Sequence, residues 1–123
     1  MAKILVVDDS DTQLYSLRKI LESAGHEVIT AADGEEGVEK AGSDTPDLIL
    51  MDVVMPGLNG FQATRKIRRN PATKGIPVIF VTTKDQETDR IWGMRQGAAA
   101  YITKPVDKQT LLSAINETLE TST

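Results

Sequence analysis

Polar residues that can bind a metal ion or a phosphoryl group follow four short apolar runs of this sequence. They are Asp8 and Asp9 after Ile4–Val7, Asp52 after Leu48–Met51, Thr82 and Thr83 after Val78–Val81, and Thr103, Lys104 and Pro105 after Ala98–Ile102. Parallel strands of an open sheet end at the same edge, and ligands bind outside that edge. We therefore expect these side chains to converge on one rim of the fold.

The three aspartates of this rim favour a hard cation. Carboxylates that share a pocket repel one another, so the pKa of at least one rises unless a cation compensates. A set of oxygen ligands without histidine or cysteine suits Mg²⁺ better than a transition metal. The sequence therefore predicts Mg²⁺ as the cofactor, with waters and phosphate oxygens completing its coordination.

Lys104 and the threonine hydroxyls supply groups that bind phosphoryl oxygens. An ammonium is a compact positive charge, and a hydroxyl donates a hydrogen bond. A carboxylate nucleophile beside these groups and Mg²⁺ is typical of phosphoryl transfer to aspartate. One aspartate at a strand end is commonly a simple helix cap, but suitable residues at the ends of four strands indicate chemistry.

The elements that must position these residues alternate along the chain. Three of the apolar runs are continuous, as in strands buried on both faces of a parallel sheet, and Glu27–Thr30 adds a fifth strand. Helical patterns follow the strands in the ranges 10–25, 33–46, 59–69, 85–96 and from 107 onward. Five such pairs predict an α/β fold: a doubly wound five-stranded parallel sheet in the flavodoxin-like order 2-1-3-4-5, with five helices.

The composition fits one soluble domain. The 123 residues suffice for a single core, which we assign to residues 1–120, with a C-terminal tail at 121–123. The chain has no cysteine, which excludes thiol chemistry, and its net charge of −4 argues against a nucleic-acid partner. No apolar run approaches the roughly 20 residues of a membrane helix, so we predict no membrane insertion and a cytoplasmic location.

Four motifs resemble those of the receiver domains of bacterial two-component response regulators, the chemotaxis-regulator-like family. They are Val6-Val7-Asp8-Asp9, Met51-Asp52-Val53-Val54-Met55-Pro56-Gly57-Leu58-Asn59-Gly60, Val81-Thr82-Thr83 and Tyr101-Ile102-Thr103-Lys104-Pro105. They span essentially the whole chain, in the family's order and spacing. The stretches Met51–Ile67 and Val81–Ala98 look especially like the small regulators of twitching motility by type IV pili.

The resemblance implies a role for each residue of the acidic rim. Asp52 is expected to be the phosphoacceptor. Mg²⁺ would be held by Asp8, Asp9, Asp52 and the backbone carbonyl of Val54. Lys104 would pair with the acceptor carboxylate and then with the phosphoryl oxygens.

The resemblance also implies a switch. Thr82 is the expected switch hydroxyl and Tyr101 the switch aromatic, while the Lys104–Pro105 bond is cis in similar proteins. Phosphorylation is expected to change a partner-binding face, with Trp92 as a candidate anchor. That face is expected to comprise Asp85–Gln96, Ala98–Ile102 and Asp107–Leu119.

The expected partners follow from this family. A histidine kinase would donate the phosphoryl group, and a downstream motility or pilus protein would read the result. The chain ends after its last predicted helix, so we expect a stand-alone receiver that is a monomer or a weak dimer. It would be a phosphoacceptor that assists its own phosphorylation and dephosphorylation, rather than an enzyme.

Three positions depart from, or vary within, the family pattern. Thr83 is bulkier than the small residue often found beside the switch threonine. Val54 and Lys84 lie two residues after the acceptor and the switch threonine, where similar proteins vary, and border the expected path of attacking water. We expect this pair to tune the lifetime of the phosphorylated state.

Two other functions fit parts of the pattern. A Mg²⁺-dependent phosphatase of the haloacid dehalogenase kind also forms an aspartyl phosphate. That family has the motif Asp-x-Asp-x-Thr after its first strand, whereas Asp8 and Asp9 of this chain are adjacent. A flavodoxin would need a Ser/Thr/Gly-rich phosphate loop there, and two aspartates repel phosphate. Turnover of free phosphate esters, or a bound flavin, would distinguish them from a receiver.

Overall fold

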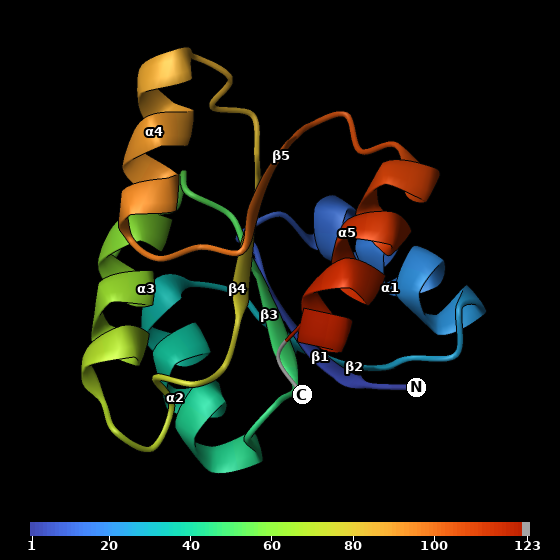
Figure 1. Cartoon of the computed structure of the whole chain (residues 1–123), viewed down its shortest axis with the longest axis horizontal. Coiled ribbons are helices and arrows are strands. Elements are labelled where there is room, and N and C mark those ends of the chain that lie inside the picture. The colour runs from blue at the N-terminus through green and yellow to red at the C-terminus, as the bar shows by residue number, and fades with distance from the viewer. Residues whose placement is uncertain (122–123) are drawn as a thin grey trace.

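The computed structural model describes residues 1–121, in which five strands alternate with five helices (Figure 1). The strands are β1 (Lys3–Val7), β2 (Glu27–Ala31), β3 (Leu48–Met51), β4 (Val78–Thr82) and β5 (Ala100–Thr103). The helices are α1 (Asp11–Ser23), α2 (Gly34–Asp44), α3 (Gly60–Arg69), α4 (Glu87–Arg95) and α5 (Lys108–Thr121). All strand pairs are parallel in the order β2-β1-β3-β4-β5, which confirms the predicted topology.

Helices cover both faces of the sheet, with α1 and α5 on one side and α2, α3 and α4 on the other (Figure 1). Successive strand residues point to opposite faces, so Leu5 and Val7 of β1 enter one core while Ile4 and Val6 enter the second. The helices contribute Ala41, Ala63 and Ile67 to the first core, and Leu17, Leu21, Leu111 and Ile115 to the second. This double burial explains the continuous apolar runs.

Side-chain caps set the starts of several helices. Ser10, Asp33 and Asn59 accept hydrogen bonds from the backbone N–H groups of Gln13, Glu36 and Gln62. Only Asn59 and Gln62 complete a reciprocal capping box among these three pairs. The Ser10 and Gln13 pair has only one half of such a box, in which Ser10 is the acceptor at 3.3 Å.

Element boundaries differ from prediction near two loops and at the C-terminal end. Strand β5 begins at Ala100 rather than Ala98, because the chain first leaves α4 through Gly97 at φ +94°. Helix α4 begins at Glu87 rather than Asp85, with Gln86 as its N-cap. Helix α5 includes Thr121, the first residue of the predicted tail, and residues 122–123 lie outside the described part.

Gly60 makes the close contact that joins α3 to the chain leaving β3. Its N–H donates to the carbonyl of Val53 at 3.0 Å, and a Cβ on Gly60 would overlap the carbonyl oxygen of Asp52. Two backbones therefore touch where the expected acceptor is held.

Replacing Gly60 with alanine should lower the free energy of unfolding by about 2 kcal/mol or more, because a rigid backbone must shift. Gly42 of α2 has open space around it, so Gly42→Ala should instead raise the free energy by roughly 0.5–1 kcal/mol. Urea unfolding of both variants measures the contrast. Equal stability of the two variants would show that the fold does not need the close backbone contact at Gly60.

Candidate functional site

Asp8, Asp52 and Lys104 each directly follow a strand, and backbone hydrogen bonds of the sheet continue onto them. Backbone N–H groups of the rim donate to carbonyls of the neighbouring strands. These bonds run from Asp8 to Ala31 (3.1 Å), from Asp52 to Val7 (3.0 Å) and from Lys104 to Thr82 (2.8 Å). The backbone of each rim residue is thus fixed by the same hydrogen bonding that builds the sheet.

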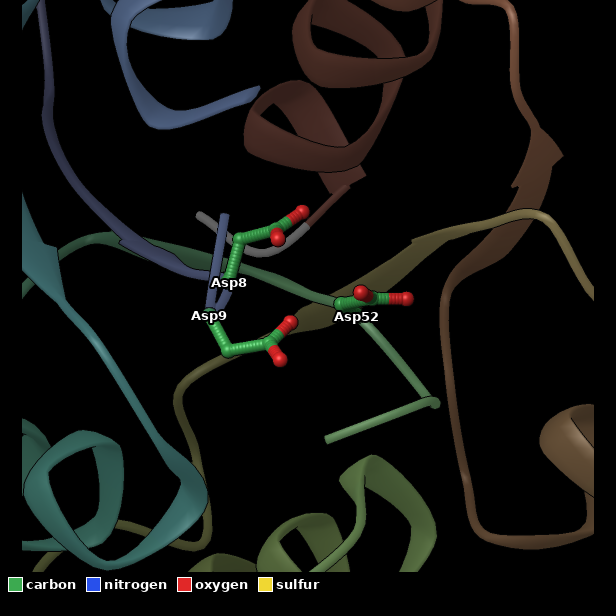
Figure 2. Close-up of side chains that lie close together, drawn as sticks. All are labelled: Asp8, Asp9 and Asp52. Carbon is green, nitrogen blue, oxygen red and sulfur yellow. The ribbon is translucent and has the colours of Figure 1, made fainter. Parts of the chain in front are cut away.

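Three carboxylates meet at the carboxyl edge of β1 and β3. Figure 2 shows Asp8 and Asp9 at the end of β1 beside Asp52 after β3, and one carboxylate oxygen from each lies within 4.8 Å of the others. Asp8 and Asp52 are buried, whereas Asp9 is exposed. The structure therefore brings together the acidic cluster that the sequence predicted.

Lys104 is the positive group of this cluster. Its ammonium lies 2.7 Å from Oδ2 of Asp8 and 3.6 Å from Oδ2 of Asp52, and its side chain is only 8% exposed. The other oxygen of Asp8 accepts the N–H of Ser10 at 2.9 Å, at the start of α1. The expected pairing of Lys104 with the Asp52 carboxylate is present, but the shorter contact is to Asp8.

The environment of Asp52 works against its ionisation. Burial raises the pKa of the Asp52 carboxyl, and the negative charge of Asp8 raises it further. The Lys104 ammonium, the Thr82 hydroxyl and the N–H of Val54 lower the pKa, but burial is the largest effect and the pKa stays above its ordinary value. An additional positive charge would therefore favour the ionised, nucleophilic form.

A short path of hydrogen bonds leads from Thr82, whose hydroxyl acts on the Asp52 carboxyl, to Tyr101. The buried Thr82 hydroxyl works to lower the pKa of Asp52 and accepts the N–H of Lys84 at 3.2 Å. The carbonyl of Lys84 accepts the hydroxyl of Tyr101 at 2.8 Å. Tyr101 points inward and is 6% exposed, and burial raises its pKa to about 12, so its hydroxyl stays a donor at neutral pH.

The sheet, the acidic cluster and this path match one known family. The model of the response regulator receiver domain matches residues 4–116. This chain belongs to that family. The phosphatase and flavodoxin readings of the sequence are therefore set aside in favour of the receiver.

Known proteins resemble this receiver over nearly its full length. Protein PilH of Pseudomonas aeruginosa is 59% identical over 97% of this chain and 98% of that protein. Response regulator PleD of Caulobacter vibrioides is 42% identical over 93% of this chain, which spans 25% of PleD. The structure of the Vibrio cholerae chemotaxis protein CheY4 matches with a TM-score of 0.88 and 36% identity, over 95% of this chain and 98% of that one.

The acidic cluster of this receiver has the donor set of a magnesium site. Two oxygens on one Mg²⁺ lie at most about 4.2 Å apart, since each Mg–O distance is about 2.1 Å. The separations within 4.8 Å among Asp8, Asp9 and Asp52 are close to this limit, and small side-chain rotations would meet it. Three carboxylates facing one ammonium also leave two negative charges for a divalent ion to balance.

Other residues of interest lie around the receiver site. The side chains of Val54 and Lys84 are exposed beside it, as is Thr83. The Lys104–Pro105 bond is cis, as the family resemblance implied. Trp92 on α4 is 46% exposed.

One contact in the receiver was missed by the sequence analysis. The guanidinium of Arg90 in α4 lies over the ring of Tyr101, with 5.2 Å between its Cζ and the ring centroid. Arg90 and Tyr101 belong to different elements, and no periodicity or motif links an arginine in a helix to an aromatic residue in the next strand. Only the packing of α4 against β5 reveals this pair.

Proposed function

We propose that this receiver accepts a phosphoryl group from a histidine kinase on Asp52, with Mg²⁺ as cofactor, and thereby changes its partner-binding face. The observation that carries the proposal is the convergence of Asp8, Asp9, Asp52 and Lys104 at one edge of the sheet. Uptake of a phosphoryl group from acetyl phosphate, measured as a gain in intact mass with and without Mg²⁺, tests it.

In the proposed reaction, a carboxylate oxygen of Asp52 attacks the phosphorus of the donor. The new Asp52 O–P bond forms as the bond from phosphorus to the donor's leaving group breaks, and the leaving group departs with that electron pair. The Lys104 ammonium, 3.6 Å from Asp52, is placed to stabilise negative charge on the transferred phosphoryl group. Mg²⁺, held by Asp8, Asp9, Asp52 and the Val54 carbonyl, would supply further positive charge for the phosphoryl oxygens.

The switch in this proposal uses the path through Lys84. When Thr82 turns its hydroxyl toward the phosphoryl oxygens, it must release the N–H of Lys84 that it now accepts. The same residue offers its carbonyl to Tyr101, so the loop after β4 couples the two side chains. Such a coupling biases a two-state element, as phosphorylation switches generally do.

Phosphorylation should therefore change backbone NMR shifts mainly in α4, β5 and α5, next to Thr82 and Tyr101. The measurement compares ¹H–¹⁵N spectra before and after addition of acetyl phosphate and Mg²⁺, with Asp52→Asn as the control. Residues that surround the acidic cluster will shift in any case. Changes beyond the cluster that are confined to α1 and α2 would contradict the proposed switch face.

Its sequence relatives suggest the pathway in which the receiver acts. The 59% identity to Protein PilH supports a role in a pilus or twitching-motility pathway, with a downstream motility protein as partner. The receiver would occupy residues 1–120 and act in the cytoplasm as a monomer or weak dimer, without nucleic acid. None of the helices within residues 1–121 is long and apolar enough to cross a membrane.

The lifetime of the phosphorylated state should depend on Val54 and Lys84. Hydrolysis needs water in line with the Asp52 O–P bond, and positioning dominates such a barrier. Val54 is 49% exposed and cannot hydrogen-bond water, while the exposed Lys84 side chain can reach over the phosphoryl oxygens. Val54→Asn combined with Lys84→Glu should speed autodephosphorylation by about 10-fold.

The assay for this prediction follows decay of the phosphorylated protein after the donor is removed, at fixed Mg²⁺ and pH. Circular dichroism checks that the double variant remains folded. Unchanged or slower decay would contradict the role of this pair and direct attention to Thr83.

A further inference from the structure

Arg90 makes two contacts with the same residue of β5. Its guanidinium lies over the Tyr101 ring at 5.2 Å from Cζ to centroid, and its Nη1 donates to the Tyr101 carbonyl at 3.0 Å. The first contact is a cation–π interaction and the second ties the arginine to the strand. Arg90 is therefore held across the ring by its own hydrogen bond.

Three other groups surround the Tyr101 ring and its hydroxyl. Gly93 of α4 approaches so closely that a Cβ there would lie 2.8 Å from Cδ2 of Tyr101. Phe80 packs beside the ring with centroids 5.9 Å apart, and the carbonyl of Lys84 accepts the hydroxyl. Arg90 differs from these groups because it is exposed while the ring beneath it is buried.

The ring also has space on the outer side of β5. A hollow of about 390 Å³ is lined by Arg90, Tyr101 and Thr103 together with Asp107 and Thr110 near the start of α5. The Tyr101 ring now fills an inner position, and this hollow offers the ring a second, outer position. Arg90 borders both positions, but its stacking contact is with the ring in the inner position, while its hydrogen bond to the backbone carbonyl fixes the guanidinium there.

We propose that Arg90 is a positioning residue of the switch, which holds the Tyr101 ring inward before phosphorylation. This inference rests on the proposed function, because it gives Tyr101 the role of switch aromatic. Loss of the guanidinium removes the cation–π contact and its hydrogen bond while leaving Gly93, Phe80 and Lys84 in place. The outward-to-inward ratio of Tyr101 should then rise roughly 2–30-fold.

The test uses the full chain labelled with 3-fluorotyrosine and observed by ¹⁹F NMR, without donor or Mg²⁺. The chain has two tyrosines, and Tyr15, 63% exposed, is the internal reference. Gly93→Ala fills the inner position and supplies the outward shift of Tyr101. Arg90→Ala should move the Tyr101 signal part of the way toward that shift.

Two further variants separate positioning from general structure. Arg90→Lys keeps a cation over the ring and should restore part of the wild-type shift. Arg95→Ala removes another exposed arginine of α4 and should leave the Tyr101 signal unchanged. A Tyr101 signal that stays at its wild-type position in Arg90→Ala, while Gly93→Ala moves it, would overturn the inference.

Addition of acetyl phosphate and Mg²⁺ distinguishes this inference from the proposed function. The change in the Tyr101 signal on adding the donor should differ between Arg90→Ala and wild type, because the two proteins start from different inward and outward populations. If the donor changes no spectrum but Arg90→Ala still shifts Tyr101, the phosphorylation proposal fails and the positioning role stands. If the donor shifts wild-type Tyr101 and Arg90→Ala behaves as wild type throughout, the positioning role fails.

Discussion

Replacing Lys104 with methionine should slow uptake of a phosphoryl group from acetyl phosphate by about 100-fold or more. Removal of one buried group that stabilises charge in a transition state typically costs 10²–10³ in rate. Lys104 is such a group, since its side chain is 8% exposed and its ammonium lies 3.6 Å from Asp52. Methionine keeps the length and apolar stem of the side chain but removes the charge.

The same substitution should leave Mg²⁺ affinity equal or higher. The Lys104 ammonium contacts Asp8 at 2.7 Å and repels a cation placed among the carboxylates, so its loss favours the metal. Lys108→Met, which changes an exposed lysine at the start of α5, is the matched control and should react at the wild-type rate. A wild-type rate for Lys104→Met, with Mg²⁺ bound, would exclude Lys104 from the reaction.

Saturating Mg²⁺ should raise the free energy of unfolding of the wild-type protein. A ligand that binds only the folded state stabilises it by about 2.7 kcal/mol at a concentration 100 times its Kd. The unfolded chain separates Asp52 from the adjacent pair Asp8 and Asp9, which is far from it in sequence, so the unfolded chain loses the site. Urea unfolding with Mg²⁺ and with a chelator measures the difference, which Asp52→Asn should reduce.

The pH dependence of this stabilisation follows from Asp52. Its pKa is raised in the folded protein, so the folded state binds more protons than the unfolded chain above the ordinary value of 3.8. Without Mg²⁺, the contribution of Asp52 to stability therefore falls as pH rises from 3.8 through the folded pKa. Stabilisation by Mg²⁺ grows across the same window, because protons compete with the ion for the carboxylate.

The difference between wild type and Asp52→Asn isolates this contribution from other carboxyl groups. Glu36 and Asp107 have lowered pKa values from hydrogen bonds and shift stability in the opposite direction, equally in both proteins. In chelator, Asp52→Asn should gain stability over wild type as pH rises. A difference that is independent of pH would show that Asp52 ionises as freely in the fold as in the unfolded chain.

The predictable parts of the fold are those set by local pattern. Strand β3 was placed at its observed bounds because Leu48–Met51 is buried on both faces and reads as one apolar run. The start of β5 was not predicted correctly, because Ala98 is apolar and buried but belongs to the loop that follows Gly97. Alanine alone carries little information about whether a buried residue lies in a strand or beside one.

The candidate site was predictable as a set of residues but not as a set of contacts. The rule that strand ends share an edge brought Asp8, Asp52 and Lys104 together. It did not show that Lys104 would lie nearer to Asp8, since that depends on rotamers. The contact of Arg90 with Tyr101 was not predicted either, because it depends on how α4 packs against β5.

Intact-mass spectrometry after exposure to acetyl phosphate tests the central claim most directly. The wild-type protein should gain one phosphoryl group in Mg²⁺ and little in chelator, and fragmentation should place that group on Asp52. Asp52→Asn should gain none under the same conditions. A phosphoryl group on Asp52→Asn, or equal uptake by wild type with and without Mg²⁺, would contradict the account.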